Sequence, residues 1–157
     1  MKNDGFSLIE VMVAMVIAGV ALMGTLGAVE VSSRHIRQAG LNSKAIELAQ
    51  ARLEAKRSCR WQSILDDDLD HDGIPETLMA DDGQGSDINA GDGIYTAGYE
   101  RDGVTVVWTI EAESPGPLRS TTMVRIRAVA SYSGLNGHKR EVQVATIRTN
   151  PNFVGQR

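Results

Sequence analysis

The sequence has a single cysteine, few aromatic residues and no excess of basic charge. Cys59 alone can form neither an intramolecular disulfide nor a cysteine-based zinc site, and the three histidines lie far apart in the sequence. Aromatic residues make up 4% of the 157 residues, too few for a base-stacking platform. The formal net charge of −4 argues against binding to nucleic acid through bulk charge, so no nucleic-acid partner is expected.

Proline is also absent before Pro75, and a long apolar run stands near the N-terminus. Residues 6–29 read FSLIEVMVAMVIAGVALMGTLGAV and contain one charged residue, Glu10. As a helix this run would span about 36 Å, which is enough for a hydrocarbon core of about 30 Å. It is too long for an ordinary secretory signal, and no small-residue cleavage site follows it. We therefore expect residues 6–29 to be retained as a membrane-spanning helix.

Glu10 is unusual because a carboxylate within a membrane span costs about 2.5–3.5 kcal/mol. Taken alone, it either has a function or lies near the end of the span and reaches the headgroups. The preceding residues favour a function. Residues 1–5 form a short polar leader that ends in Gly5, and Phe6 and the apolar run follow, with Glu10 as the fifth residue after the leader.

This arrangement resembles the type IV prepilin signal, which combines a cleavage glycine, an aromatic residue, a glutamate at this spacing and an apolar run. The resemblance implies that a prepilin peptidase cuts after Gly5 on the cytoplasmic side and N-methylates Phe6, and that Glu10 serves in filament assembly. A positive amine on Phe6 and the Glu10 carboxylate would pair in a low-dielectric setting, and a pair between subunits would fix their axial register. The basic residues on either side of the span do not follow the positive-inside rule, so its orientation rests on the resemblance.

Good helix formers continue from the apolar run to about residue 57, so residues 30–60 should form the amphipathic half of one long helix. The expected apolar face of this half consists of Ile36, Ala39, Gly40, Ile46, Ala49 and Leu53. Residues 45–54 resemble the corresponding stretch of PilV-type minor pilins and of minor pseudopilins of type II secretion.

Three later segments alternate apolar and polar residues with a period of two, as half-buried strands do: 104–110, 123–132 and 140–148. Residues 103–157 should therefore form three or four antiparallel strands and a C-terminal tail. The apolar face of such a sheet needs a cover, and the amphipathic helix is available for it. The expected class is α+β, with the pilin-like layout that the resemblance implies.

The middle of the chain is strongly acidic. Residues 66–102 hold 12 acidic residues and one basic residue, a formal charge of −11, so the rest of the chain carries +7. Glycine and aspartate dominate and no regular periodicity is present, which predicts a long loop over residues 61–102. Such a loop either stays solvated or is compensated by a cation.

Two parts of this region have spacings that favour Ca²⁺. The stronger candidate resembles the first half of an EF-hand loop, with Gly73 at the turn, the Ile74 carbonyl as backbone ligand, and four carboxylates: Asp68, Asp70, Asp72 and Glu76. Met79 stands where the closing bidentate glutamate should be. The weaker candidate consists of Asp87, Asn89 and Asp92. The alternative to a structural Ca²⁺ site is a solvated acidic turn.

An enzyme is not expected, because no apolar environment that would raise a carboxylate pKa accompanies these residues. The features predict a minor pilin of a type IV pilus that supports pilus assembly, adhesion or motility. Its expected partners are the prepilin peptidase, other pilin or pseudopilin subunits and the inner membrane, which it leaves for the cell-surface pilus. The alternatives are a minor pseudopilin of type II secretion in a periplasmic pseudopilus, and a membrane-anchored calcium-binding domain that needs no peptidase.

Overall fold

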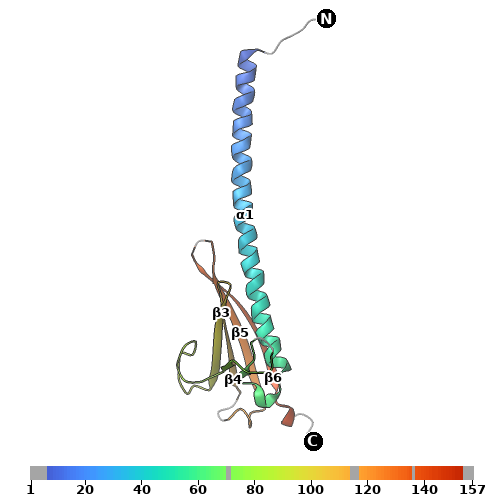
Figure 1. Cartoon of the computed structure of the whole chain (residues 1–157), viewed down its shortest axis with the longest axis vertical. Helices are drawn as coiled ribbons and strands as arrows, with labels where there is room; N and C mark the ends of the chain where they lie inside the picture. Colours follow the sequence, from blue (N-terminus) through green and yellow to red (C-terminus); the bar gives the residue numbers. More distant parts are fainter. Residues whose placement is uncertain (1–6, 70–71, 114–116, 136, 154–157) are drawn as a thin grey trace. The chain divides into compact units, whose positions relative to one another are not determined.

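The structure is a computed structural model that describes residues 7–69, 72–113, 117–135 and 137–153 (Figure 1). The chain divides into two units, residues 1–39 and residues 40–157, which we call the first and the second unit. In chain order the elements are α1 (Leu8–Ser58), η1 (Trp61–Ser63), β1 (Asp66–Asp67), β2 (Thr77–Leu78), β3 (Ile94–Arg101), β4 (Val104–Ala112), β5 (Met123–Ser133), β6 (Lys139–Thr149) and η2 (Pro151–Phe153).

The described part of the first unit is α-helical. The predicted helix from about residue 7 to residue 57 is confirmed as α1, and none of its glycines interrupts it. Its large hydrophobic side chains from Leu8 to Val31 are 44–81% exposed. By length and composition α1 could cross a membrane, and its most apolar stretch is not buried inside the molecule.

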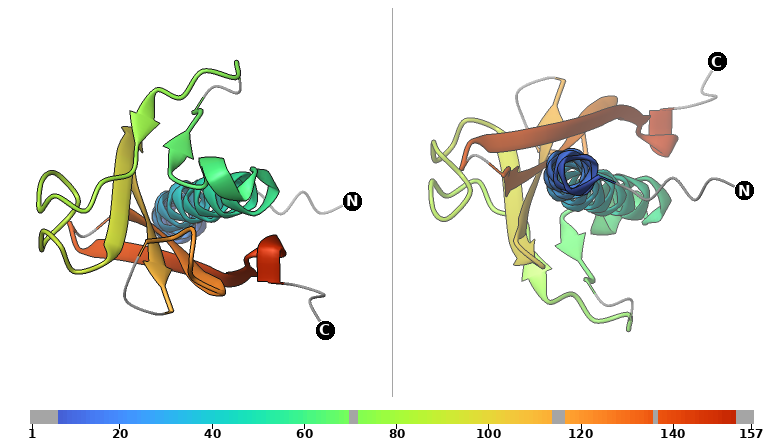
Figure 2. Two further views of the ribbon diagram at one scale, coloured as in Figure 1. Left: turned by 90° about the horizontal axis from the view of Figure 1, so that it is seen from below. Right: turned by 90° about the horizontal axis from the view of Figure 1, so that it is seen from above.

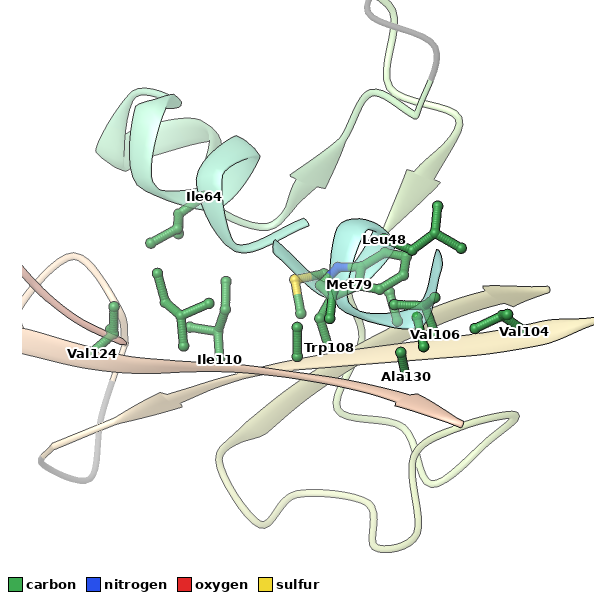
Figure 3. Packing of buried hydrophobic residues seen from close by; sticks show 14 of the residues in the cluster. Leu48, Ile64, Met79, Val104, Val106, Trp108, Ile110, Val124 and Ala130 are labelled. Atoms are coloured by element: carbon green, nitrogen blue, oxygen red, sulfur yellow. The ribbon is translucent and has the colours of Figure 1, made fainter. Parts of the chain in front are cut away.

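The second unit is built on a four-stranded antiparallel sheet in the order β3-β4-β5-β6 (Figure 2). The three strands expected from alternation are confirmed as β4, β5 and β6. One face of β4 and β5 supplies most of the core, with these residues buried: Val104, Val106, Trp108, Ile110, Val124, Ile126, Ala128, Ala130 and Tyr132. Figure 3 shows Leu48 of α1 and Met79, after β2, meeting Trp108 in this core.

The C-terminal part of α1 covers the apolar face of the sheet. Ala45 and Ala49 are fully buried, and such small side chains let the helix backbone come close to the strands. The expected apolar face was wrong in part, because Ile36 is 71% exposed. The buried face includes two charged residues, Arg52 and Lys56, which a hydrophobicity pattern does not select.

The acidic region is not one long loop as predicted. β3 pairs with β4 along its whole length, from Ile94 opposite Glu111 to Arg101 opposite Val104. Asp102 and Gly103 connect the two strands with φ angles of 54° and 74°, and two-residue type I′ hairpins require positive φ at both positions. The Asp-Gly dipeptide is a hairpin signal, but the acidic composition around it favoured a loop.

Two shorter pairings also order the acidic region. β1 and β2 pair as a small antiparallel sheet, and Ala80 bridges to Thr96 of β3. The intervening residues form two loops, which we call the first acidic loop (68–76) and the second acidic loop (81–93). Figure 2 shows the second acidic loop on the side of β3 that faces away from residues 40–58 of α1.

Candidate functional site

Glu10 lies in the first turn of α1, where the positive end of the helix dipole favours a carboxylate. Its side chain is exposed, and Ala14 and Ala18 follow it at helical spacing on the same face. This face therefore combines one carboxylate with small side chains that leave room for a neighbouring helix. The predicted processing residues Gly5 and Phe6 lie outside the described residues, so their roles stay predictions.

The first acidic loop is ordered by bonds between its own carboxylates and backbone. Asp68 accepts hydrogen bonds from the backbone N–H groups of Asp72 at 3.1 Å and Gly73 at 2.8 Å. Asp72 accepts one from Ile74 N–H at 2.7 Å, and Glu76 accepts one from Leu69 N–H. Gly73 has a φ of 91°, in agreement with its predicted place at the turn.

Three of the predicted calcium ligands come together in this loop. Asp68, Asp72 and Glu76 each offer a carboxylate oxygen, and these oxygens lie within 4.8 Å of one another. Oxygens that share one Ca²⁺ at 2.3–2.6 Å lie within about 5 Å of each other, so the spacing fits such an ion. Asp70 lies outside the described residues.

The second acidic loop is ordered by Asp81, which is not among its predicted ligands. Asp81 accepts hydrogen bonds from three backbone N–H groups, those of Gly91 at 2.6 Å, Asp92 at 3.1 Å and Gly93 at 2.9 Å. It stands about ten residues before its partners, so no local motif marks it.

The predicted ligands of the second acidic loop bond to backbone groups. Asp87 accepts from Gly83 N–H at 2.7 Å, and Asp92 accepts from Ile94 N–H at 2.9 Å. Asn89 is exposed. Over the described ranges, Asp87 and Asp92 join no cluster of three acidic, histidine or cysteine side chains with metal-binding separations. Calcium binding here remains a prediction without geometric support.

Beneath the first acidic loop lies a buried charge cluster, which we define as Arg52, Lys56 and Asp67. Lys56 and Asp67 are each 2% exposed, with Lys56 Nζ 2.9 Å from Asp67 Oδ1. Trp108 Nε1 donates to Asp67 Oδ2 at 2.9 Å, so both carboxylate oxygens have a partner. Burial lowers the pKa of the Lys56 amine below its ordinary value, and the nearby Asp67 charge opposes part of this shift.

The end of α1 is held by Arg148 of β6. Its Nη1 donates to the carbonyl oxygen of Lys56 at 2.6 Å and lies 3.3 Å from Cys59 Sγ, and its Nη2 donates to the Cys59 carbonyl. Its guanidinium carbon also lies 5.7 Å from the ring centroid of Trp61. Cationic donors at a helix C-terminus satisfy carbonyls that have no partner within the helix, so these contacts stabilise the helix end.

The first 26 residues match a family model described as the prokaryotic N-terminal methylation motif. Comparisons with curated proteins and with solved structures each gave no match. The chain thus carries a prepilin-type signal, and its long N-terminal helix and antiparallel sheet have the layout of the pilin fold. These features fit a pilin-like protein, and the motif is of the kind that pilins and pseudopilins share.

Proposed function

We propose that this chain is a minor pilin that is processed, methylated and assembled into a type IV pilus. The observation that carries the proposal is the methylation motif at residues 1–26, which includes the start of α1, where the large hydrophobic side chains from Leu8 to Val31 are exposed. In this role the helix anchors the subunit in the inner membrane before assembly. Neighbouring helices then replace the lipid around it in the filament.

The proposed assembly step follows from the charges at the N-terminus. Cleavage after Gly5 creates an amine on Phe6, which N-methylation leaves positively charged. The Glu10 carboxylate of an adjacent subunit pairs with this amine, because both charges are poorly solvated in the apolar filament core. The pair sets how far one helix is shifted along the next. The release of lipid and the close packing of the helices stabilise the rest of the interface between subunits.

The same N-terminal features serve a pseudopilin, so the location of the assembled protein distinguishes the two functions. An epitope tag on the second unit allows the chain to be followed in filaments sheared from the cell surface. A minor pilin is recovered in the sheared fraction and disappears from it when the pilus motor is deleted. Retention in the periplasm together with a secretion defect would instead identify a type II pseudopilin.

We also propose that the first acidic loop binds Ca²⁺. The convergence of Asp68, Asp72 and Glu76 supports this, as does the charge of −11 over residues 66–102. A cation would relieve the mutual repulsion of these carboxylates. Without the closing glutamate, we expect a dissociation constant of about 10⁻⁴–10⁻³ M, the range of extracellular calcium modules.

A further inference from the structure

A surface cavity of about 210 Å³ on the second unit is lined by Arg52, Leu69, Tyr99, Glu100 and Arg101. It lies between the helix face that covers the sheet and the end of β3. Neither the proposed membrane anchor nor the proposed calcium ligands form its wall, so the cavity has no role in the functions proposed above.

Arg52 in the wall of this cavity is a buried cation that has no counter-charge among the residues that the structure describes. The residue is 6% exposed, and its Nε and Nη1 atoms are buried without any hydrogen-bond partner. Its Nη2 reaches the carbonyl oxygen of Leu69 at 3.5 Å, the outer limit of a hydrogen bond. Buried guanidinium groups are ordinarily paired with carboxylates, so this one lacks its usual partner.

Aromatic rings compensate for part of this charge. The guanidinium carbon lies 5.5 Å from the ring centroid of Tyr99 and 5.9 Å from that of Trp108, within cation–π distance. Such contacts are weaker than the cost of leaving a buried charge unpaired.

The carboxylate of Asp67 in the same buried charge cluster already pairs with another cation. Asp67 binds Lys56 through Oδ1 and Trp108 through Oδ2, so the buried charge cluster holds two cations and one anion. Among the described residues, no carboxylate forms an ion pair with Arg52. The missing negative charge has to come from outside these residues.

We propose that the cavity binds a carboxylate, which supplies the counter-charge of Arg52. A carboxylate is planar and matches the guanidinium fork, and it carries one charge. The wall also holds Glu100 and Arg101, whose charges offset each other, and the acidic region around the cavity repels phosphate more strongly than a singly charged carboxylate. The carboxylate belongs either to an acidic side chain of a neighbouring subunit or to a free organic acid.

The test uses the full chain in detergent micelles and the fluorescence of Trp108. The chain has two tryptophans, so Trp61→Phe leaves Trp108, which contacts the Arg52 guanidinium, as the only indole probe. Sodium formate is titrated against sodium chloride at equal ionic strength. The expected result is a saturable change with half-saturation at about 1–10 mM, since formate has only three heavy atoms. Sodium phosphate at the same ionic strength should give a weaker response.

Matched variants assign the response to Arg52. Arg52→Met should weaken formate binding by about tenfold or more, because the charge is lost. Arg125→Gln removes an arginine that is 64% exposed and does not line the cavity, so it should bind like the parent. If near-ultraviolet circular dichroism shows that Arg52→Met is misfolded, Arg52→Lys replaces it and should also bind more weakly, because its compact ammonium lacks the fork.

Three outcomes would overturn the proposal: no saturable response to formate, equal responses of the Arg52 variants and the parent, or tighter binding of phosphate. Asp70→Asn tests a counter-charge from within the chain. If only that variant responds to formate, Asp70 fills the role and the proposal is wrong. In sheared filaments, reduced incorporation of Arg52→Met identifies a neighbouring subunit as the source, whereas normal incorporation with formate binding identifies a free acid. Formate binding is measured on the isolated chain, so its result does not depend on whether the chain is assembled into a pilus.

Discussion

Lys56→Met should strongly destabilise the second unit. Lys56 Nζ donates to the carbonyl oxygens of Ile64 and Asp66, both at 2.9 Å, and pairs with Asp67 at the same distance. Methionine has a similar length but no donor, so the variant leaves the 2% exposed Asp67 carboxylate without its cation. Removing one partner of a buried ion pair costs about 3–5 kcal/mol, and we expect a loss of this size.

A double-mutant cycle separates the ion pair from packing effects. Asp67→Asn keeps an acceptor for Trp108 but leaves Lys56 charged and unpaired, which should cost a similar amount. The double variant Lys56→Met with Asp67→Asn removes both charges of the ion pair, so neither partner is left buried without the other. Its loss should therefore be smaller than the sum of the single losses by about 2 kcal/mol or more.

Urea unfolding of the full chain in detergent micelles provides the assay. Both tryptophans, Trp61 and Trp108, are buried in the second unit, so their fluorescence reports its unfolding. A loss below about 1 kcal/mol for Lys56→Met, or strictly additive losses, would refute the argument. Such values are typical of an exposed pair and would mean that Lys56 and Asp67 are not buried together.

The remaining predictions concern pH, assembly and calcium. Burial lowers the pKa of Lys56, so as the pH rises the folded chain loses the Lys56 proton at a lower pH than the unfolded chain does. Between the lowered pKa and the ordinary pKa of 10.5, the unfolded chain therefore binds more protons than the folded chain. The stability difference between the parent and Lys56→Met, measured as the difference in their free energies of unfolding in urea, should therefore increase as the pH rises toward 10.5. A stability difference that does not change with pH would contradict this. Glu10→Val should insert into membranes at least as well as the parent, since it removes a cost of about 2.5–3.5 kcal/mol, but be depleted from sheared filaments on immunoblots. Normal incorporation would show that Glu10 does not set register. Calcium at 1 mM should stabilise the chain by about 1.4 kcal/mol if the dissociation constant is about 0.1 mM. Thermal melts in calcium, in magnesium and in chelator measure this stabilisation, with Asp68→Asn as the control. If the parent melts at the same temperature in all three conditions, the first acidic loop is a solvated loop and not a calcium site.

The fold was largely predictable because its main elements have strong periodic patterns. The long helix and strands β4, β5 and β6 each occur where the sequence predicts them. β3 lies within the segment predicted as a loop, because acidic residues and glycines around it obscure its pattern, although Asp102-Gly103 after it is a hairpin turn. The buried helix face was only partly predicted, because Arg52 and Lys56 are inside and their long side chains do not read as apolar.

The candidate sites were predictable only where a local motif marks them. Residues 1–26 combine several signals within one short segment, and the spacing of Asp68, Asp72 and Glu76 brings them onto one loop. The contact between Asp67 and Trp108 joins residues 41 positions apart. Such contacts arise from the pairing of strands and the packing of α1, and nothing in the local sequence of either residue indicates them.

The intact mass of the purified chain tests the central claim, that this is a processed pilin-like subunit, most directly. The chain is expressed in cells with and without an active prepilin peptidase, beside a Gly5→Val variant whose larger side chain should block the cut. With the peptidase, the parent should lose residues 1–5 and gain one methyl group, whereas the variant and the peptidase-free sample should keep their full length. A full-length parent in the presence of active peptidase, or the same cut in its absence, would contradict the account.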